Sequence, residues 1–432
     1  MAVRLTKFKI GLYVFFVICA VGSVAALRFG GAGNGGGGDD ETVRPTISVW
    51  GGIDGQRMGY INGSNGNPVR INYQQVRADT VYNQFLEAVA TNQSPDLIIM
   101  PFSALGQFFK TKKNFPIPYT SYTERAYDDA FISGTSFLKT DEGIMALPLF
   151  TDPLVTFYNR AMLDNAGVLA PMSSWNDAYT VSSDLTQRSG QLGITRSTFG
   201  LGEASNITHA KTIMSALFLQ LGLQIMPANG EDSDLRTRTT SGTIGASALR
   251  FYTSFADPSK NFYTWNRSLP ADKNAFLNET LVYYFGLASE RQELQSKNPN
   301  MSLDMALFPQ AAGGQPLTTG DLYVALFPKA ARSIPAAISY AYWLTSPATV
   351  EGLIEAGAYS YTPVLRTVLA KPGTDRFTPI EYRSAVISKF WYDLGGMSSK
   401  DIFADMISDV TTERRSVEES VERAADRLNA VQ

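Results

Sequence analysis

The sequence predicts an α/β protein made of two lobes, and two observations support that prediction. The chain has 432 residues, which is more than a single domain usually contains. Between residues 46 and 101, short apolar runs alternate with an amphipathic helical segment, as in a parallel sheet flanked by helices. Hydrophobic residues make up 44% of the chain and charged residues 18%, which is enough apolar material for a core in each lobe.

Charge and composition exclude several classes of function. The formal net charge is −3, and acidic and basic residues are interspersed, so no clustered basic surface is available to follow a nucleic acid backbone. Cys19 and His209 are the only residues of their kinds. We therefore expect no metal site and no cofactor, and the histidine leaves little room for a Ser-His-Asp triad.

The N-terminal segment predicts a membrane protein. Basic residues precede an uncharged stretch from 10 to 27, which is near the lower limit for crossing a bilayer. We interpret 1–28 as a membrane anchor or a signal segment, and the small residues in 23–26 leave cleavage open. The glycine-rich segment 29–45 reads as a flexible tether, which favours an uncleaved anchor. Because the positive charges precede the span, the rest of the chain is expected outside the cytoplasm, held by one membrane helix.

The first elements of the folded part follow the tether. Strands are predicted at 47–50 and 69–73, and a helix at 78–91. Residues 95–101 form a continuous apolar run between prolines, which is typical of a strand buried on both faces of a sheet. Ligands of such sheets bind beyond the carboxyl ends of the strands. The loops after the first and third strands are therefore candidate ligand loops.

The later elements are also visible as patterns. Residues 144–148 and 154–158 read as two strands. Ser173 or Ser174 suits the start of a helix. The segment 210–221 is apolar nearly all round, which predicts a buried helix, and 416–431 is a charged amphipathic helix.

Five stretches, in this order, resemble a known family. They are ISVWGGID at 47–54, PDLIIMPFSALG at 95–106, ALPLFTDPLVTFYNRAMLDNAG at 146–167, YTWNRSLPADKNAFLNETLVYYF at 263–285 and AISYAYWLTS at 337–346. The family is the family 1 extracellular solute-binding proteins of ABC transporters, the maltose-binding-like receptors. The third stretch resembles the family's crossing between its lobes and is the most specific.

The resemblance implies a type II periplasmic-binding-protein-like fold, in which each lobe has a mainly parallel sheet flanked by helices. It places 46–150 and 270–320 in the first lobe, and 151–269 and 321–432 in the second. The ligand would lie in the cleft between them, and closure of the lobes would be sensed by permease subunits. The implied protein is a monomeric receptor for a small ligand, and a sugar is the favoured one.

Sugars are bound by aromatic rings and by polar groups paired with hydroxyls. The candidate ligand residues are Trp50, Asp54, Ser103, Asp152, Asn206, Trp265, Phe285 and Tyr323. Asp152 is the leading carboxylate, because the family has an acidic ligand contact at the matching position of the crossing. Its alternative is a structural one, in which it caps the turn before Pro153.

Other candidates also have structural alternatives. Trp50 could pack in the core, Asp54 could lie in a surface turn, and Asn206 could cap a helix. His209 reads as a structural histidine at the start of a buried helix, and Trp391 is assigned to the core.

Three classes of function are compared. The first is a transport receptor, and the second is a membrane-tethered ligand sensor of the same fold. The third is a carboxylate-dependent glycoside hydrolase, for which the sequence contains no signature. The expectation is therefore a binding protein and not an enzyme.

Overall fold

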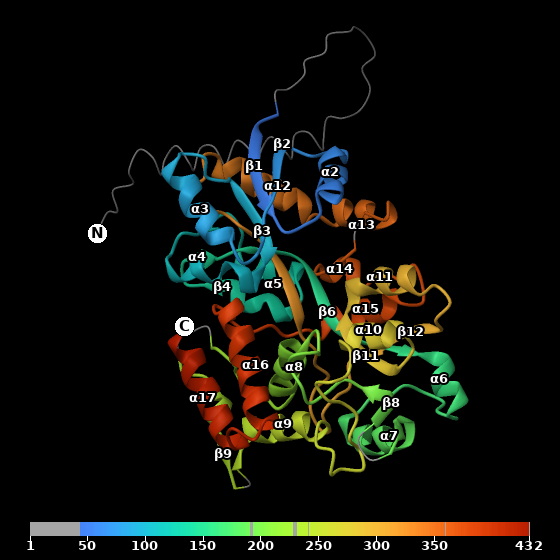
Figure 1. Cartoon of the computed structure of the whole chain (residues 1–432). Helices are drawn as coiled ribbons and strands as arrows, with labels where there is room; N and C mark the ends of the chain where they lie inside the picture. Colours follow the sequence, from blue (N-terminus) through green and yellow to red (C-terminus); the bar gives the residue numbers. More distant parts are fainter. Residues whose placement is uncertain (1–43, 191–192, 228–230, 241, 359, 432) are drawn as a thin grey trace.

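The computed structural model describes residues 44–431, except 191–192, 228–230, 241 and 359, and it shows two α/β lobes (Figure 1). The predicted anchor at 1–28 and almost all of the tether at 29–45 lie outside the described residues. None of the helices in the described part is long and apolar enough to cross a membrane.

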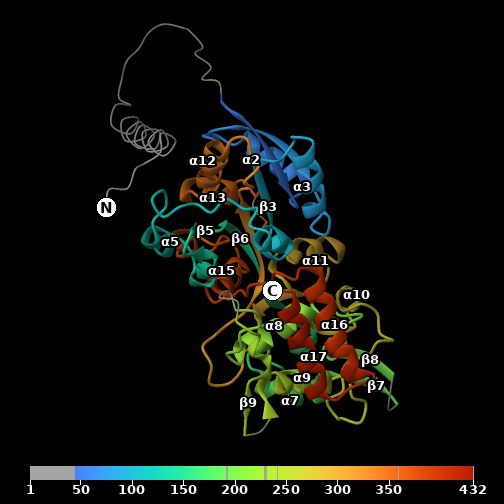
Figure 2. The same cartoon turned by 90° about the vertical axis from the view of Figure 1, so that its left-hand side faces the viewer.

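The first lobe is built on three parallel strands. β1 (Thr46–Gly51) pairs in parallel with β2 (Arg70–Gln75) and with β3 (Leu97–Pro101). These strands confirm the sequence prediction, as does α3 (Val81–Ala90). Helices cover both faces of the sheet, with α3 on one side and α12 on the other (Figure 2). The helices of this lobe are α2 (Gly55–Gly63), α3, α4 (Gly106–Lys110), α5 (Glu124–Ala130), α12 (Ile334–Leu344), α13 (Pro347–Glu355), α14 (Arg366–Leu369) and α15 (Thr378–Val386).

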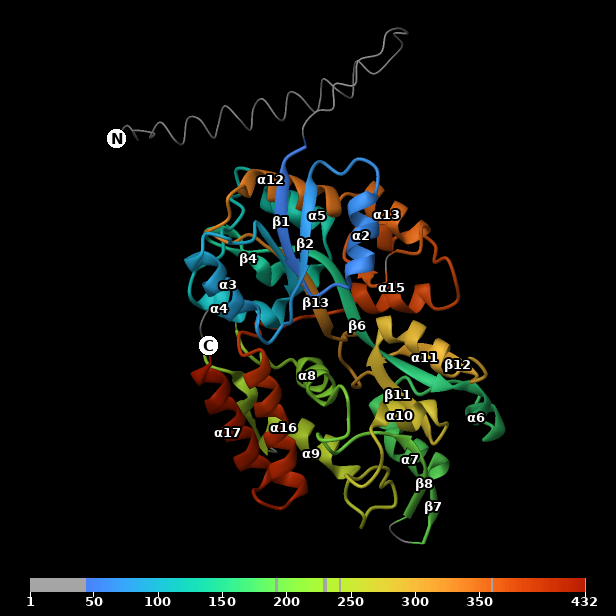
Figure 3. The same ribbon diagram turned by 45° about the horizontal axis from the view of Figure 1, so that its top comes forward.

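The second lobe adds four strands to the main sheet, beside a separate hairpin of β9 (Arg238–Thr239) and β10 (Gly242–Thr243). The four strands of the main sheet are β7 (Gln187–Ser189), β8 (Gly193–Phe199), β11 (Leu281–Leu287) and β12 (Leu303–Leu307). Its helices are α6 (Arg160–Asn165), α7 (Ala178–Leu185), α8 (Ala210–Gln220), α9 (Ile244–Ser254), α10 (Asp272–Leu277), α11 (Arg291–Lys297), α16 (Met397–Thr411) and α17 (Val417–Ala430). The predicted buried helix is α8, and the predicted C-terminal helix is α17, which packs with α16 beside α9 (Figure 3).

One long strand connects the lobes. β6 (Leu147–Asn159) is buried along its whole length and replaces the two separate strands expected here. Its first half pairs with β13 (Gly320–Leu326) and with β14 (Thr362–Pro363) in the first lobe. Its second half pairs with β11 and β12 in the second lobe. The sheet therefore continues through both lobes, in the order β2-β1-β3-β13-β6-β11-β8-β7.

The sheet is mixed, which corrects the expectation of a mainly parallel sheet in each lobe. Parallel pairing is found for β1 with β2 and β3, and for β11 with β8. β6 is antiparallel to β11, β12, β13 and β14, and β13 is antiparallel to β3. The reason is that β6 leaves the first lobe whereas β13 returns to it, so the two crossing strands run in opposite directions.

The lobe boundaries also differ from those expected. The segment 270–320 was expected in the first lobe, but its strands β11 and β12 pair with the second half of β6. The segment 321–432 was expected wholly in the second lobe, but β13 pairs with β3 in the first. α16 and α17 do lie in the second lobe, against α8 and α9. Strand pairing between distant segments decides this division, and sequence order does not display it.

Three crossings lie side by side between the lobes: the first is β6, the second is the segment around Thr318, and the third is the segment around Lys389. Thr318 links the second crossing to the other two. Its hydroxyl donates to the Leu154 carbonyl of the first crossing (2.8 Å), and its carbonyl accepts from the Lys389 amide of the third (2.9 Å). Gly320 packs against the backbone of Asp152, and a Cβ atom there would lie 2.1 Å from the Asp152 carbonyl oxygen. Only glycine permits this approach, which brings β13 against β6.

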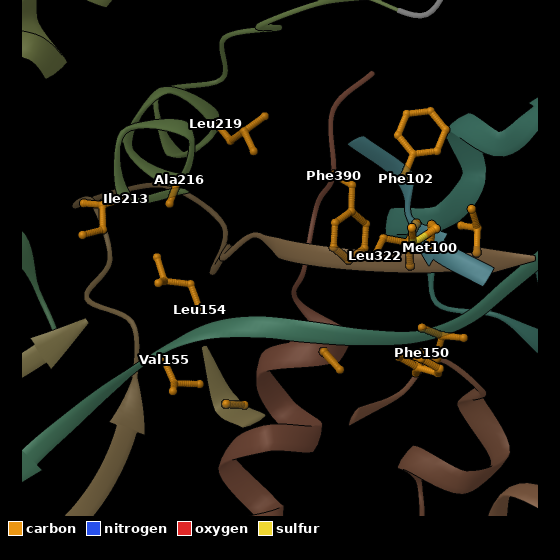
Figure 4. Packing of buried hydrophobic residues seen from close by; sticks show 14 of the residues in the cluster. Met100, Phe102, Phe150, Leu154, Val155, Ile213, Ala216, Leu219, Leu322 and Phe390 are labelled. Atoms are coloured by element: carbon orange, nitrogen blue, oxygen red, sulfur yellow. The ribbon is translucent and has the colours of Figure 1, made fainter. Parts of the chain in front are cut away.

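Each lobe packs its core against β6. Successive side chains of a strand point to opposite faces, and Figure 4 shows Leu154 pointing toward α8 while Val155 points away from it. Phe102, Leu322 and Phe390 gather near the first-lobe half of the strand (Figure 4). Their apolar groups form one wall of the cavity described next.

Candidate functional site

Two adjoining cavities lie between the lobes, with volumes of about 110 and 370 Å³. Both are lined by Ser103, Lys211 and Asp321. Ser103 follows β3 of the first lobe, Lys211 lies in the first turn of α8 in the second lobe, and Asp321 lies on the crossing strand β13. A molecule held here would contact both lobes and the connection between them. We call this space the interlobe cavity.

Larger hollows are confined to single lobes. One of about 910 Å³ lies over β1, β2 and α3, and one of about 650 Å³ lies between α9 and α16. None of the residues that line these hollows belongs to the three crossings. Size alone therefore does not select the candidate site, and contact with both lobes does.

The backbone of Asp321 is hydrogen-bonded, whereas its carboxylate has no hydrogen-bond donor among the described residues. Its carbonyl accepts a hydrogen bond from the Thr151 hydroxyl (3.0 Å), and its backbone pairs with Asp152. In the part of the chain that the structure describes, the carboxylate has neither a hydrogen-bond donor nor an ion-pair partner. Burial raises the pKa of Asp321, although the positive charges of His209 and Lys211 act against this.

Lys211 holds the third crossing. Its ammonium group donates to the carboxylate of Asp393 and to the Ser399 hydroxyl (2.7 Å). The same nitrogen lies 5.2 Å from the centre of the Trp391 ring, within the range of a cation–π interaction. Trp391 is partly exposed and lines the interlobe cavity. The ion pair thus positions an aromatic ring at the wall of the cavity.

A buried ionic network lies at the start of α8. The Glu290 carboxylate accepts hydrogen bonds from His209 (3.0 Å), Lys273 (2.9 Å) and the Tyr284 hydroxyl (2.8 Å). Burial acts to raise the pKa of Glu290, but His209 and Lys273 outweigh it and lower the pKa to about 2. Burial likewise acts to lower the pKa of His209, and Glu290 reverses this and raises it. The sequence interpretation of His209 as a structural histidine is confirmed by these bonds.

Tyr323 belongs to an aromatic stack beside Asp321. Phe150 stacks on Tyr361, with ring centres 4.5 Å apart, and contacts Tyr323 in a tilted arrangement, with centres 4.7 Å apart. The Tyr361 hydroxyl lies 3.4 Å from that of Tyr323. The structure thus brings Tyr323 close to the interlobe cavity, although Tyr323 packs with other rings.

Asp152 is buried in the crossing and already bonded. Its carboxylate accepts hydrogen bonds from the Ser289 amide (2.9 Å) and the Ser289 hydroxyl (2.5 Å). Burial raises its pKa to about 7, with a further contribution from the neighbouring Asp321. Both carboxylate oxygens therefore hold the turn before α11. This placement supports a structural role, although the partner is Ser289 and not the turn before Pro153.

Trp50 and Asp54 have the structural roles that were the alternatives to ligand binding. Trp50 is 5% exposed and packs in the core beneath the hollow over β1 and β2. Asp54 is exposed and caps α2, accepting hydrogen bonds from the backbone amides of Gln56 (2.9 Å) and Arg57 (3.4 Å). Neither residue lines the interlobe cavity.

Asn206, Trp265 and Phe285 are internal to the second lobe. The Asn206 side chain accepts from the Trp265 indole (3.1 Å) and donates to the carbonyls of Asn266 (2.9 Å) and Leu269 (3.0 Å). Trp265 is 1% and Phe285 2% exposed. Their aromatic groups fill the core, so of the eight sequence candidates Ser103 alone lines the interlobe cavity.

Sequence reasoning missed Lys211, Asp321 and Trp391. Lys211 lies in a helix that looked wholly buried, and Trp391 was assigned to the core. Asp321 offered one signal, because a carboxylate directly after Gly320 opens a strand that is otherwise apolar. No local pattern shows that these three residues meet.

Two lobes that share three crossings and enclose a cavity with both apolar and charged walls define a two-lobed binding protein. The sequence matches the family of bacterial extracellular solute-binding proteins over residues 61–378, and the chain belongs to this family. It is therefore a solute-binding protein and not an enzyme, and its binding domain functions outside the cytoplasm. Comparison with curated protein sequences finds no match.

Solved structures share the fold at low sequence identity. The cyclic α-maltosyl-1,6-maltose binding protein of Arthrobacter globiformis has a TM-score of 0.72 at 17% identity, over 90% of this chain and 99% of that one. The sugar-binding protein MalE of Xanthomonas citri has a TM-score of 0.71 at 15% identity, over 89% and 97%. A solute-binding protein of Thermotoga lettingae bound to α-D-tagatose has a TM-score of 0.68 at 17% identity, over 90% and 99%. These similarities support the two-lobed fold.

Proposed function

We propose that this chain is the carbohydrate-binding receptor of an ABC importer and that its ligand occupies the interlobe cavity. The observation that carries the proposal is the pairing of an unoccupied carboxylate, Asp321, with an aromatic ring, Trp391, in one cavity between the lobes. Carboxylates accept hydrogen bonds from sugar hydroxyls, and aromatic rings offer an apolar face to the C–H side of a sugar.

The fold relatives point in the same direction. Their names describe binding of tagatose, of a cyclic maltosyl-maltose and of sugars. Within this chain we propose Ser103, Lys211, Asp321 and Trp391 as ligand contacts, with Tyr323 beside them. Asp152 has the separate task of holding the crossing through Ser289.

The proposed lobes follow the strand pairing. The first comprises 46–152 and 320–389, and the second comprises 153–319 and 390–431. Ligand that touches both would favour closure about the crossings, and permease subunits would recognise the closed form.

The attachment to the membrane is also a proposal. A basic start, the apolar stretch 10–27 and the glycine-rich tether support an uncleaved anchor that carries a monomeric receptor outside the cell. N-terminal sequencing of protein recovered from membranes tests this, because cleavage would remove the first residues.

A membrane-tethered sensor of the same fold is the alternative function. Genes for permease and ATPase subunits beside this gene would favour the importer, and a gene for a signalling partner would favour the sensor. Both alternatives use the same cavity.

A melting screen tests the binding function. The full-length chain, purified in mild detergent, is mixed with sugars, polyols, amino acids and phosphorylated metabolites. A ligand that binds only the folded state raises Tm by mass action. A rise with one or more sugars is expected, and a rise confined to amino acids or phosphorylated metabolites would contradict the proposal.

A further inference from the structure

Asp321 differs from every other acidic side chain around the crossings. Glu290 is bonded to His209 and Lys273, and Asp152 is bonded to Ser289. Asp393 accepts from Lys211 and from the amide of Gly396 (3.2 Å). The Asp321 side chain is partly buried and lines the interlobe cavity, and none of the described residues donates a hydrogen bond to its carboxylate. Hydrogen-bond donors for the Asp321 carboxylate must therefore come from a bound molecule or from water.

The positive charges near Asp321 are already neutralised. Lys211 is paired with Asp393, and His209 is paired with Glu290. Lys400 also lines the wider of the two cavities, but the charges that act on Asp321 are those of His209, Lys211 and Asp393. The wall of the interlobe cavity therefore keeps one carboxylate whose negative charge has no counter-ion of its own.

We propose that Asp321 sets the charge selectivity of the interlobe cavity, so that the site accepts neutral and amino sugars and rejects acidic ones. A neutral sugar donates hydroxyl hydrogen bonds to this carboxylate, and an amino sugar adds an ion pair. A uronic acid or a sugar phosphate would bring a second negative charge into a partly dry space, where like charges repel strongly. This inference rests on the proposed carbohydrate-binding function and names the ligands that the site selects.

Matched sugars separate charge from shape. The probes are glucose, glucosamine and glucuronate, with the corresponding galactose and mannose sets, and maltose and mannobiose as larger neutral sugars. Their affinities for the full-length chain are measured by calorimetry at pH 7. We expect at least one neutral or amino sugar to bind about tenfold or more tightly than the uronate of its set.

Variants at position 321 test the residue. Asp321→Asn keeps the shape and removes the charge, and Asp321→Ser is a second variant in case the first folds poorly. Either variant should bind the neutral sugar about tenfold more weakly than the wild type does. The ratio between the affinities for the neutral sugar and for the uronate should become smaller. Asp184→Asn is the control, because it removes one charge from the exposed face of α7, away from the cavity.

The outcomes are distinguishable. Binding of no sugar of any charge would overturn the proposed function and this inference with it. A uronate that binds more tightly than its neutral partner would overturn the inference alone. Unchanged sugar affinities in both folded variants would also overturn it, while the carbohydrate-binding function would stand.

Discussion

At the residue scale, Asp152 and Asp321 are opposite each other in the β6–β13 ladder, yet their carboxylates have different surroundings. Both oxygens of Asp152 accept from Ser289, whereas Asp321 has no donor among the described residues. One carboxylate holds the backbone together, and the other remains available to a ligand. Two aspartates that look alike in the sequence thus have separate tasks.

The raised pKa of Asp152 predicts a pH dependence of stability. Its folded pKa of about 7 lies above the ordinary value of 3.8, so the folded state binds the proton more tightly than the unfolded state. This contribution to the free energy of unfolding is complete below about pH 4 and is lost as the pH rises to about 7. The shift corresponds to at most about 4 kcal/mol. Asp152→Asn should remove this fall in the free energy of unfolding, because the amide does not titrate and can also form two hydrogen bonds with Ser289.

Urea unfolding at pH 5 and pH 8 measures this effect. The variant should gain stability relative to the wild type between these pH values. The difference between the two proteins isolates Asp152, because His209 and Glu290 titrate in both. Asp184→Asn serves as the control and should run parallel to the wild type. If the stability of Asp152→Asn changed with pH as that of the wild type does, the raised pKa of Asp152 would be contradicted.

At the scale of the element, the third crossing is held by close backbone packing. The segment before α16 lies directly against α4 of the first lobe, and a Cβ atom at Gly106 would lie 2.3 Å from the Leu394 carbonyl oxygen. Leu394 is adjacent to Asp393, the partner of Lys211. The position of the cavity wall therefore depends on the absence of a side chain at one position of a different element.

Gly106→Ala should push this crossing away from α4. Overpacking of this kind costs about 1–3 kcal/mol, and we expect a lower Tm and weaker sugar binding, because Trp391 moves with the crossing. Thermal melts and calorimetry measure both effects.

Gly59→Ala is the matched control. Gly59 lies in α2, and a Cβ atom there would meet no atom within 4 Å, so alanine should stabilise the helix by about 0.5–1 kcal/mol. If Gly106→Ala behaved like Gly59→Ala, the close packing of the crossing would be disproved.

At the scale of the whole molecule, the lobes share one sheet but enclose a cavity. The chain passes between the lobes at β6, at the segment around Thr318 and at the segment around Lys389, which are mutually hydrogen-bonded. Ion pairs from Arg291 to Asp375 and Glu381 also join the two lobes. Such a narrow connection permits rotation of one lobe against the other with few changes in backbone conformation. A ligand bound to both lobes would shift the population toward the closed form.

Small-angle scattering tests closure. We expect the radius of gyration of a fragment starting at residue 44 to fall when it is saturated with the sugar found in the melting screen. The same sugar added to Asp321→Asn, at concentrations below its weakened Kd, should leave the radius unchanged. An unchanged radius in the saturated wild type would contradict a closing cleft.

The sequence alone determined the class of the fold and many of its elements. The apolar run at 95–101 predicted β3, and the helical periodicity at 78–91 predicted α3. The apolar segment at 210–221 predicted α8, because its residues are buried on nearly all sides. These patterns are local, since burial of a strand or helix is written into the spacing of its own side chains.

The tertiary structure decided the strand pairing and which side chains meet at the candidate site. β13 joins β3 and β6 across a long stretch of chain, so its place in the sheet depends on pairing that no local pattern records. Trp265 and Phe285 have the chemistry of ligand platforms but fill a core, whereas Trp391 and Lys211 reach the cavity from two distant segments. A binding site is a property of side chains brought together from different elements, and chain order alone does not contain that proximity.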